Sequence, residues 1–142
     1  MTPVPVLGHR AEQVRLAMRL VMAVFYVVAG VVHLRSPEAF LPIVPGWVPF
    51  PRQVVLFTGV CEIAGAIGLL VPRLRWWAGV MLAAYAVAVY PANIKHALEG
   101  IALAGGHQSW AYHGPRLAAQ PLLVWWALFV GCAINWPFGR KA

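Results

Sequence analysis

The sequence contains no aspartate, and its only acidic residues are four glutamates. Together with 11 lysines and arginines, charged residues make up 11% of the 142 residues, against roughly 25% in an average soluble domain. So few charges cannot cover the surface of a water-soluble globule. The 61% of apolar residues also excludes a disordered chain, because disorder requires low hydrophobicity and high net charge. The composition, with a mean hydropathy of +0.72, therefore predicts a small integral membrane protein.

Cysteine is scarce as well, and the two residues present, Cys61 and Cys132, form no Cys-x-x-Cys motif. A dithiol redox motif is therefore excluded. The two cysteines fall at different predicted depths, so we expect them to stay unpaired as small packing residues. Nucleotide-binding glycine motifs and Ser-His-Asp arrangements are also missing. The residues leave open whether the protein is an enzyme, and we assign no catalytic residue.

Long stretches without charge separate the basic residues, and a membrane-spanning helix needs about 20 apolar residues. We predict an all-α, integral membrane four-helix bundle, with helices near 15–34, 53–72, 76–95 and 117–137. Arg19 lies inside the first helix, and we expect its charged end to extend to the membrane interface. The membrane domain then covers residues 15–137. A cytoplasmic N-terminal tail (1–14) precedes it, and a cytoplasmic C-terminal tail (138–142) follows it.

The net charge of +7 is spread singly over the ends of the apolar stretches rather than gathered in a patch. This pattern favours the lipid bilayer as partner and argues against nucleic acid. One side of the predicted bundle carries seven basic residues: Arg10, Arg15, Arg19, Arg73, Arg75, Arg140 and Lys141. The other side carries four: Arg35, Arg52, Lys95 and Arg116. The excess predicts a multi-pass protein of a bacterial-type inner membrane with both termini in the cytoplasm.

Polar residues concentrate in the outer half of the predicted bundle. Glu62 lies near the middle of the second helix, and a carboxyl group within the membrane is costly and usually faces the bundle interior. Other polar side chains are expected at similar or shallower depth on all four helices. The candidate residues for ligand binding and proton exchange are Glu62, His33, Asn93, Tyr26, Thr58 and Gln120. They predict either a pocket that opens to the outer side or a layer of hydrogen bonds between helices.

Two further features belong to the outer side. The loop 35–52 holds five prolines with large apolar residues between them, so it is either a lid over the pocket or a stiff connector. Several histidines also fall there, but His107 and His113 are six residues apart in a glycine-flanked loop. This is not a recognised metal-ligand spacing, so we predict no metal site.

An ordered series of short motifs resembles the DoxX-like integral membrane proteins over about residues 15–137. The motifs are Gly30 with His33, Pro37-x-x-Phe40, Gly59-x-x-Glu62-Ile63, Pro91-Ala92-Asn93, Arg116-x-x-x-Gln120 and Trp125-Trp126. The resemblance implies a four-helix membrane bundle and a link to membrane redox complexes, since the family takes its name from a subunit of a thiosulfate:quinone oxidoreductase. Related proteins in thiol–disulfide chemistry have paired cysteines, which this chain lacks, so that activity is not carried over.

Our leading hypothesis is an accessory subunit of a membrane redox system that binds a quinone or similar lipophilic molecule in the outer-half pocket. The chain has no intrinsic cofactor motif, so a redox partner protein has to supply the electron carrier. One alternative is a proton-coupled small-molecule transporter with Glu62 as the proton-exchanging group. Another is a membrane scaffold without a ligand. The sequence does not specify the ligand, the partner or the oligomeric state.

Overall fold

The computed structural model describes residues 7–102 and 106–139, and within these ranges the chain forms helices and turns without a β-strand. The elements are α1 (His9–Arg35), two short 3-10 helices, η1 (Pro37–Ala39) and η2 (Leu41–Ile43), and then α2 (Pro51–Leu70), α3 (Arg75–Glu99), α4 (Trp110–Ala118) and α5 (Gln120–Val130). The prediction of an all-α protein is confirmed. Arg140 and Lys141, which entered the charge count, lie outside the described residues.

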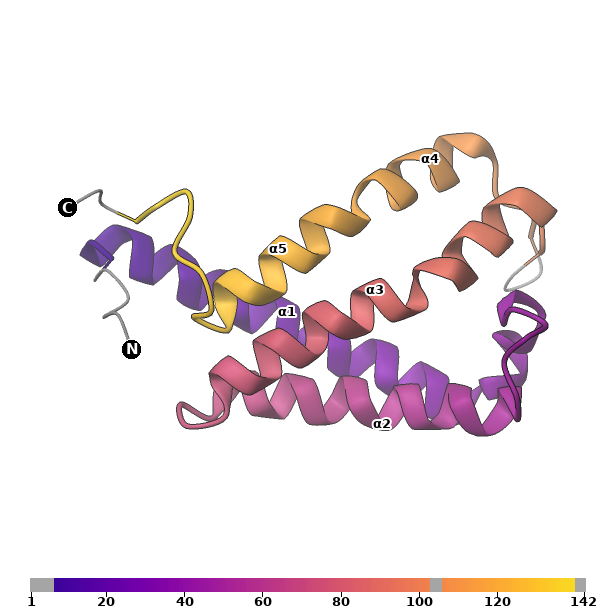
Figure 1. Ribbon diagram of the computed structural model, residues 1–142, viewed down its shortest axis with the longest axis horizontal. Coiled ribbons are helices and arrows are strands. Elements are labelled where there is room, and N and C mark those ends of the chain that lie inside the picture. Colours follow the sequence, from indigo (N-terminus) through magenta and orange to yellow (C-terminus); the bar gives the residue numbers. More distant parts are fainter. Residues whose placement is uncertain (1–6, 103–105, 140–142) are drawn as a thin grey trace.

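The long helices run alternately up and down (Figure 1). We call the end where α1 begins, α2 turns into α3 and α5 ends the termini end. The opposite end, with the segment 36–50 between α1 and α2, is the loop end. Helix α1 packs mainly against α2, and α3 packs mainly against α5. The molecule thus consists of two helix pairs, which α2 and α3 join along one side.

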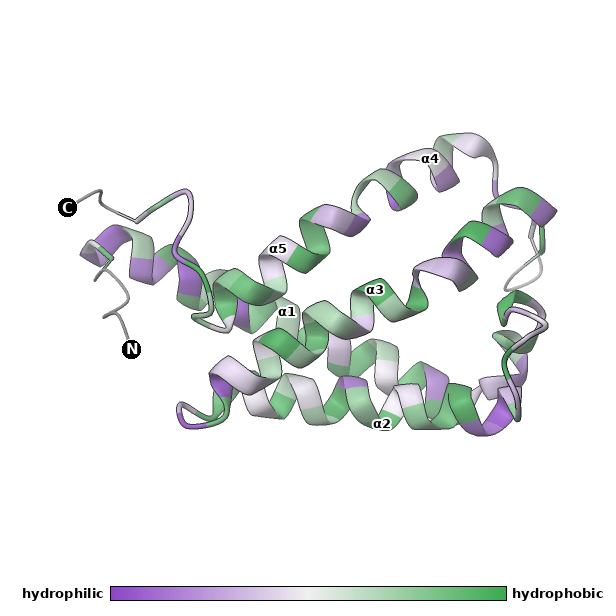
Figure 2. Cartoon of the chain, in the orientation of Figure 1, coloured by the Kyte–Doolittle hydropathy of each residue, from purple (hydrophilic) through white to green (hydrophobic). Residues whose placement is uncertain are grey.

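Three helices, α1, α2 and α3, are long and apolar enough to cross a membrane. No more than a third of the apolar window in each is buried within the molecule. Figure 2 shows hydrophobic residues along the helices and hydrophilic residues mainly towards their ends. A water-soluble monomer rarely exposes apolar surface on this scale. These observations support the prediction of a membrane protein.

The fourth predicted helix, near 117–137, differs in the structure. The segment is divided at Ala119 into α4 and α5, and α5 ends at Val130. Pro121 explains the division, because it has no N–H to donate to the carbonyl of Leu117. The hydroxyl of Tyr90 donates to that carbonyl instead, at 3.3 Å. With 11 residues, α5 is too short to span a membrane alone, so a fourth pass would need both helices together.

The first helix also differs from its prediction, since it begins at His9 rather than near residue 15. Arg15 and Arg19 are buried, and Arg19 Nε donates to the Val130 carbonyl at 2.8 Å. Arg15 donates to the Ile134 carbonyl at 3.1 Å and to the Asn135 side chain. The expectation that Arg19 extends to the interface is therefore wrong. The guanidinium of Arg19 instead finds its partner within the protein, at the carbonyl end of α5, where the helix dipole is negative.

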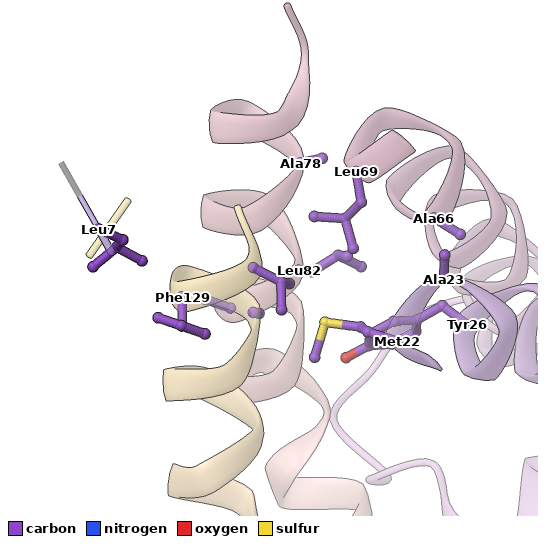
Figure 3. Packing of buried hydrophobic residues seen from close by; sticks show 12 residues of the cluster. Leu7, Met22, Ala23, Tyr26, Ala66, Leu69, Ala78, Leu82 and Phe129 are labelled. Carbon is purple, nitrogen blue, oxygen red and sulfur yellow. The ribbon is translucent and has the colours of Figure 1, made fainter. Parts of the chain in front are cut away.

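The compact core lies at the termini end. Met22 of α1, Leu69 of α2, Leu82 of α3 and Phe129 of α5 are almost completely buried there (Figure 3). Small residues allow this close packing: a Cβ atom on Gly79 would come within 2.6 Å of the Gly131 Cα atom. Cys61 and Cys132 are both free thiols, as expected from their different depths.

Candidate functional site

A cavity of about 750 Å³ occupies the loop end, where the helices no longer pack tightly. Side chains from α1, α2, α3, α4, α5 and the loop 36–50 line it, and most of them are apolar or aromatic. The sequence-predicted candidates all lie on its wall: Tyr26, His33, Thr58, Glu62, Asn93 and Gln120. Residues from four predicted helices are thus brought together at one cavity. Their roles in ligand binding remain predictions.

Two glycines set the geometry of the first polar group. Gly30 and Gly59 face each other across the α1–α2 contact, where a Cβ atom on Gly30 would come within 2.6 Å of the Gly59 carbonyl oxygen. His33 and Glu62 each follow one of these glycines by three residues, which places them on the same helix faces. The backbone contact therefore brings His33 Nδ1 to 2.9 Å from Glu62 Oε2. This is the structural basis of the paired Gly-x-x-His and Gly-x-x-Glu motifs.

Glu62 is buried between three helices. The hydroxyl of Tyr85, on α3, donates to Glu62 Oε1 at 2.7 Å. Glu62 Oε2 is near His33 Nδ1, but the N–H direction of the ring favours the Ala29 carbonyl, also 2.9 Å away. Oε2 is therefore a buried oxygen without an aligned donor. A proton on the carboxyl group belongs on Oε2, because Oε1 already accepts the Tyr85 hydrogen.

His33 and Glu62 both line the cavity, and His33 is the more exposed of the two. Its ring stacks on Phe40 of the loop, with centroids 4.1 Å apart. The Nδ1 atom faces Ala29 and Glu62, so Nε2 is the ring nitrogen left to meet a ligand. Glu62, by contrast, is almost fully enclosed. We conclude that a molecule in the cavity would meet His33 before it meets the carboxyl group.

The remaining two candidates of this region contribute differently. Tyr26 is buried beside Glu62 and packs edge-on against Tyr85, with ring centroids 6.1 Å apart. Thr58 is one turn from Glu62 on α2, but its hydroxyl donates to the Val55 carbonyl of its own helix at 2.7 Å. Thr58 is therefore a polar wall residue whose donor is already engaged.

A second polar group comes from α3, α4 and α5. Asn93 Nδ2 donates to Gln120 Oε1 at 3.4 Å, and the Gln120 amide in turn donates to the Ala86 carbonyl of α3. Arg116 joins them, with Nη2 donating to Asn93 Oδ1 at 2.7 Å. We call Asn93, Arg116 and Gln120 the Arg116 group. It gives the cavity a second set of hydrogen-bonding side chains, on α3, α4 and α5, whereas His33 and Glu62 are on α1 and α2.

The proline-rich loop forms part of the cavity wall. Phe40, Val44 and Trp47 are among the loop residues on its wall. Lys95 Nζ of α3 donates to the Val44 carbonyl at 2.8 Å, which connects the loop to the opposite helix pair. Two phenylalanines, Phe25 of α1 and Phe57 of α2, also line the cavity, and 50% and 68% of their surface is exposed on the outside of the molecule.

Sequence reasoning missed two members of the site. Tyr85 was visible only as a tyrosine at about the depth of Glu62, and nothing in the sequence linked the two. Arg116 was noted as a topology signal and as part of the Arg116-x-x-x-Gln120 motif, and it was not placed in a site on either ground. Its spacing of four residues before Gln120 could have placed both on one helix face. The other histidines do not add a metal site: no group of three potential ligands is close enough among residues 7–102 and 106–139.

A comparison with protein-family models matches residues 22–131 to DUF8561, a domain of unknown function. The matched range extends from the middle of α1 to just past the end of α5, so it includes most of the core and the whole wall of the cavity. No curated protein and no solved structure gives a match. Because the match covers well over half of the sequence, the chain belongs to the DUF8561 family.

Proposed function

We propose that the protein binds a quinone or similar lipophilic molecule in the loop-end cavity, as an accessory subunit of a redox system in a bacterial-type inner membrane. The supporting observation is a largely apolar cavity of about 750 Å³, among apolar helices, with two polar groups on different helix pairs. Sites for small molecules are commonly apolar clefts of roughly 300–1,000 Å³ with a few polar groups. The resemblance to DoxX-like proteins suggests the redox context.

A quinone suits this wall chemically. Its flat ring is apolar, and its two carbonyl oxygens need hydrogen-bond donors. His33 offers a ring nitrogen at one polar group, and the Arg116 group offers amide and guanidinium donors at the other. Aromatic residues such as Phe40 and Phe57 provide the surface on which a ring can pack.

The His33–Glu62 pair supplies a place for a proton, which quinone reduction consumes. The Tyr85 hydroxyl donates to Oε1, so Oε2, beside His33 Nδ1, is the carboxyl oxygen that can exchange a proton. Because Nδ1–H donates to the Ala29 carbonyl, a proton shared by the pair can sit on Glu62 Oε2 or on His33 Nε2. When His33 carries it, the ionised carboxylate beside Nδ1 stabilises the imidazolium, and Nε2–H can be donated to a ligand oxygen, which leaves a neutral ring. Electrons have to come from a redox partner protein.

The test is the binding of decylubiquinone to the purified protein in mild detergent, followed by tryptophan fluorescence between pH 5.5 and 8.5. We expect Glu62→Gln to weaken binding roughly tenfold, as expected for the loss of one charge-assisted hydrogen bond, and to flatten its pH dependence. Glu99→Gln is the matched control. Glu99 is exposed at the end of α3, so this variant should leave the affinity and its pH dependence unchanged.

The competing scaffold hypothesis has its own supporting observation. Glu62 connects α2 to α3 through Tyr85 and lies against α1 through His33, so its contacts alone could hold three helices together. A scaffold predicts that no quinone binds to the wild type and that Glu62→Gln is nearly neutral, since an amide can replace a protonated acid. Unchanged affinity and pH profile in Glu62→Gln would remove Glu62 from the binding mechanism.

A further inference from the structure

The four glutamates of the chain all lie within the described residues, and each is near a basic side chain other than Arg116. The pairs are Glu12–Arg15 at 3.2 Å, Glu38–Arg52 at 3.0 Å, Glu62–His33 at 2.9 Å and Glu99–Lys95 at 4.0 Å. Since the sequence has no aspartate, no acidic side chain remains for Arg116. A carboxylate or phosphate that pairs with Arg116 in the way an acidic side chain would therefore has to belong to another molecule.

Arg116 is held in place by neutral groups. Nη2 donates to Asn93 Oδ1 at 2.7 Å, and Nη1 lies 2.8 Å from His96 Nδ1. An arginine only donates, so His96 Nδ1 must accept, which puts the ring proton on Nε2 towards Gln108. The guanidinium also lies 5.7 Å from the ring centroid of Tyr112. These contacts orient the guanidinium but do not neutralise its charge.

The position of Arg116 turns this charge towards the cavity. Its side chain is half-buried on the cavity wall, next to Tyr112, Asn93 and Gln120. The guanidinium has five N–H donors, and its two contacts with Asn93 and His96 use only part of them. A partly buried cation is stabilised strongly by an opposite charge, and a guanidinium pairs well with the two oxygens of a carboxylate or phosphate.

We infer that the Arg116 group is an anion-binding subsite, and that the ligand of the cavity is an amphiphile with a carboxylate or phosphate at one end. The inference rests on the proposed function, because it concerns the same cavity and, among the quinones and similar lipophilic molecules proposed there, selects those that carry an anionic group. The anionic end pairs with Arg116, and the apolar body lies along the aromatic wall. The same anionic chemistry is available from a single-chain acid within the cavity or from the headgroup of an anionic phospholipid.

The experiment compares probes of equal chain length with the purified protein in mild detergent: dodecanoate, dodecyl phosphate and neutral dodecanol. Wild type should bind either anion at least tenfold more tightly than the alcohol, the ratio expected for one charge-assisted contact. Arg116→Gln should abolish this ratio, and Arg116→Lys should retain part of it. Arg52→Gln should preserve it, because Arg52 pairs with Glu38 and is not on the cavity wall.

A second arm identifies the source of the anion. In nanodiscs of phosphatidylcholine, wild type should keep its preference for the free anions. Phosphatidylglycerol that lowers the affinity of wild type for dodecanoate more than it lowers that of Arg116→Gln identifies the headgroup as the occupant. Equal binding of acid and alcohol by wild type, or a preference that survives in a folded Arg116→Gln variant, overturns the inference. If Arg116→Gln does not fold, a ratio in Arg116→Lys equal to that of wild type overturns it as well.

The two proposals can fail separately. Glu62→Gln, which tests the quinone, should leave the preference for acid over alcohol intact. A protein that binds the acids but no quinone retains the anionic subsite and loses the proposed redox role. A protein that binds the quinone with no preference for acids retains the redox role and loses the subsite.

Discussion

Gly30 and Gly59 show how a missing side chain creates a polar contact elsewhere. The two residues let the backbones of α1 and α2 touch, and one helical turn later His33 meets Glu62. A glycine within a helix normally costs stability relative to alanine. Here the close approach requires it, since any Cβ atom on Gly30 would overlap the Gly59 carbonyl oxygen and the Ile63 side chain.

Gly30→Ala should therefore destabilise the protein by about 1–3 kcal/mol, the range for overpacking a tight contact. It should also weaken quinone binding, because separated helices pull His33 away from Glu62. The measurement is the thermal unfolding midpoint in detergent together with the binding assay. Gly46→Ala is the control, since nothing lies within 4 Å of a Cβ atom there. Equal midpoints for the two variants would contradict the role of the contact.

At the residue scale, the sequence indicated which polar side chains share one half of the bundle, and their roles in binding stay predictions. A buried carboxyl in an apolar helix has to face inwards, and residue counts from the helix ends placed His33 and Gln120 at shallower depth than Glu62. Arg116 could not be assigned in this way. A long charged side chain at a helix end can reach the interface or turn inwards, and its direction depends on acceptors such as His96 on another helix.

At the scale of elements, apolar length predicted α2 and α3 well, because charges and prolines mark their ends. The fourth segment was less predictable. Pro121 divides it, and the chain turns away after Val130 although apolar residues continue. The long α1 begins early for a similar reason: Arg15 and Arg19 find carbonyl partners at the end of α5, and no pattern within α1 itself indicates them.

The proline-rich loop is a second element with an assignable role. The hydrogen bond from Lys95 to the Val44 carbonyl connects it to α3 on the other side of the cavity. Lys95→Met should remove this connection and speed the dissociation of bound quinone several-fold, with little change in unfolding temperature. Stopped-flow fluorescence measures the rate, and Lys95→Arg, which keeps a donor, should dissociate nearly as slowly as wild type. Equal rates in all three proteins would favour a simple connector.

On the scale of the whole molecule, the packed core occupies the termini end of the bundle and the cavity occupies the loop end. The same helices pack tightly at the termini end through small residues such as Gly79 and separate at the loop end around polar ones. Composition alone predicted the membrane class. The sequence did not predict the separation of the helix pairs, because it results from the sum of contacts between segments far apart in the chain.

The number of membrane passes is a prediction at this scale. If α4 and α5 cross together, both termini lie on the same side, as the basic residues predict. Fusions of green fluorescent protein and of alkaline phosphatase to each terminus report the side directly. We expect fluorescence and no phosphatase activity at both ends. Phosphatase activity at one terminus only would mean three passes, and it would require a different account of the fourth segment.

Phe25 and Phe57 belong at once to the wall of the cavity and to the outer surface of the helices. In a bilayer that surface faces acyl chains, so the side of the cavity borders hydrocarbon rather than water. A guest molecule dissolved in the membrane is already concentrated there by partitioning. Even a weak intrinsic affinity then gives high occupancy in the cell, whereas dilution into detergent micelles during purification would empty the protein.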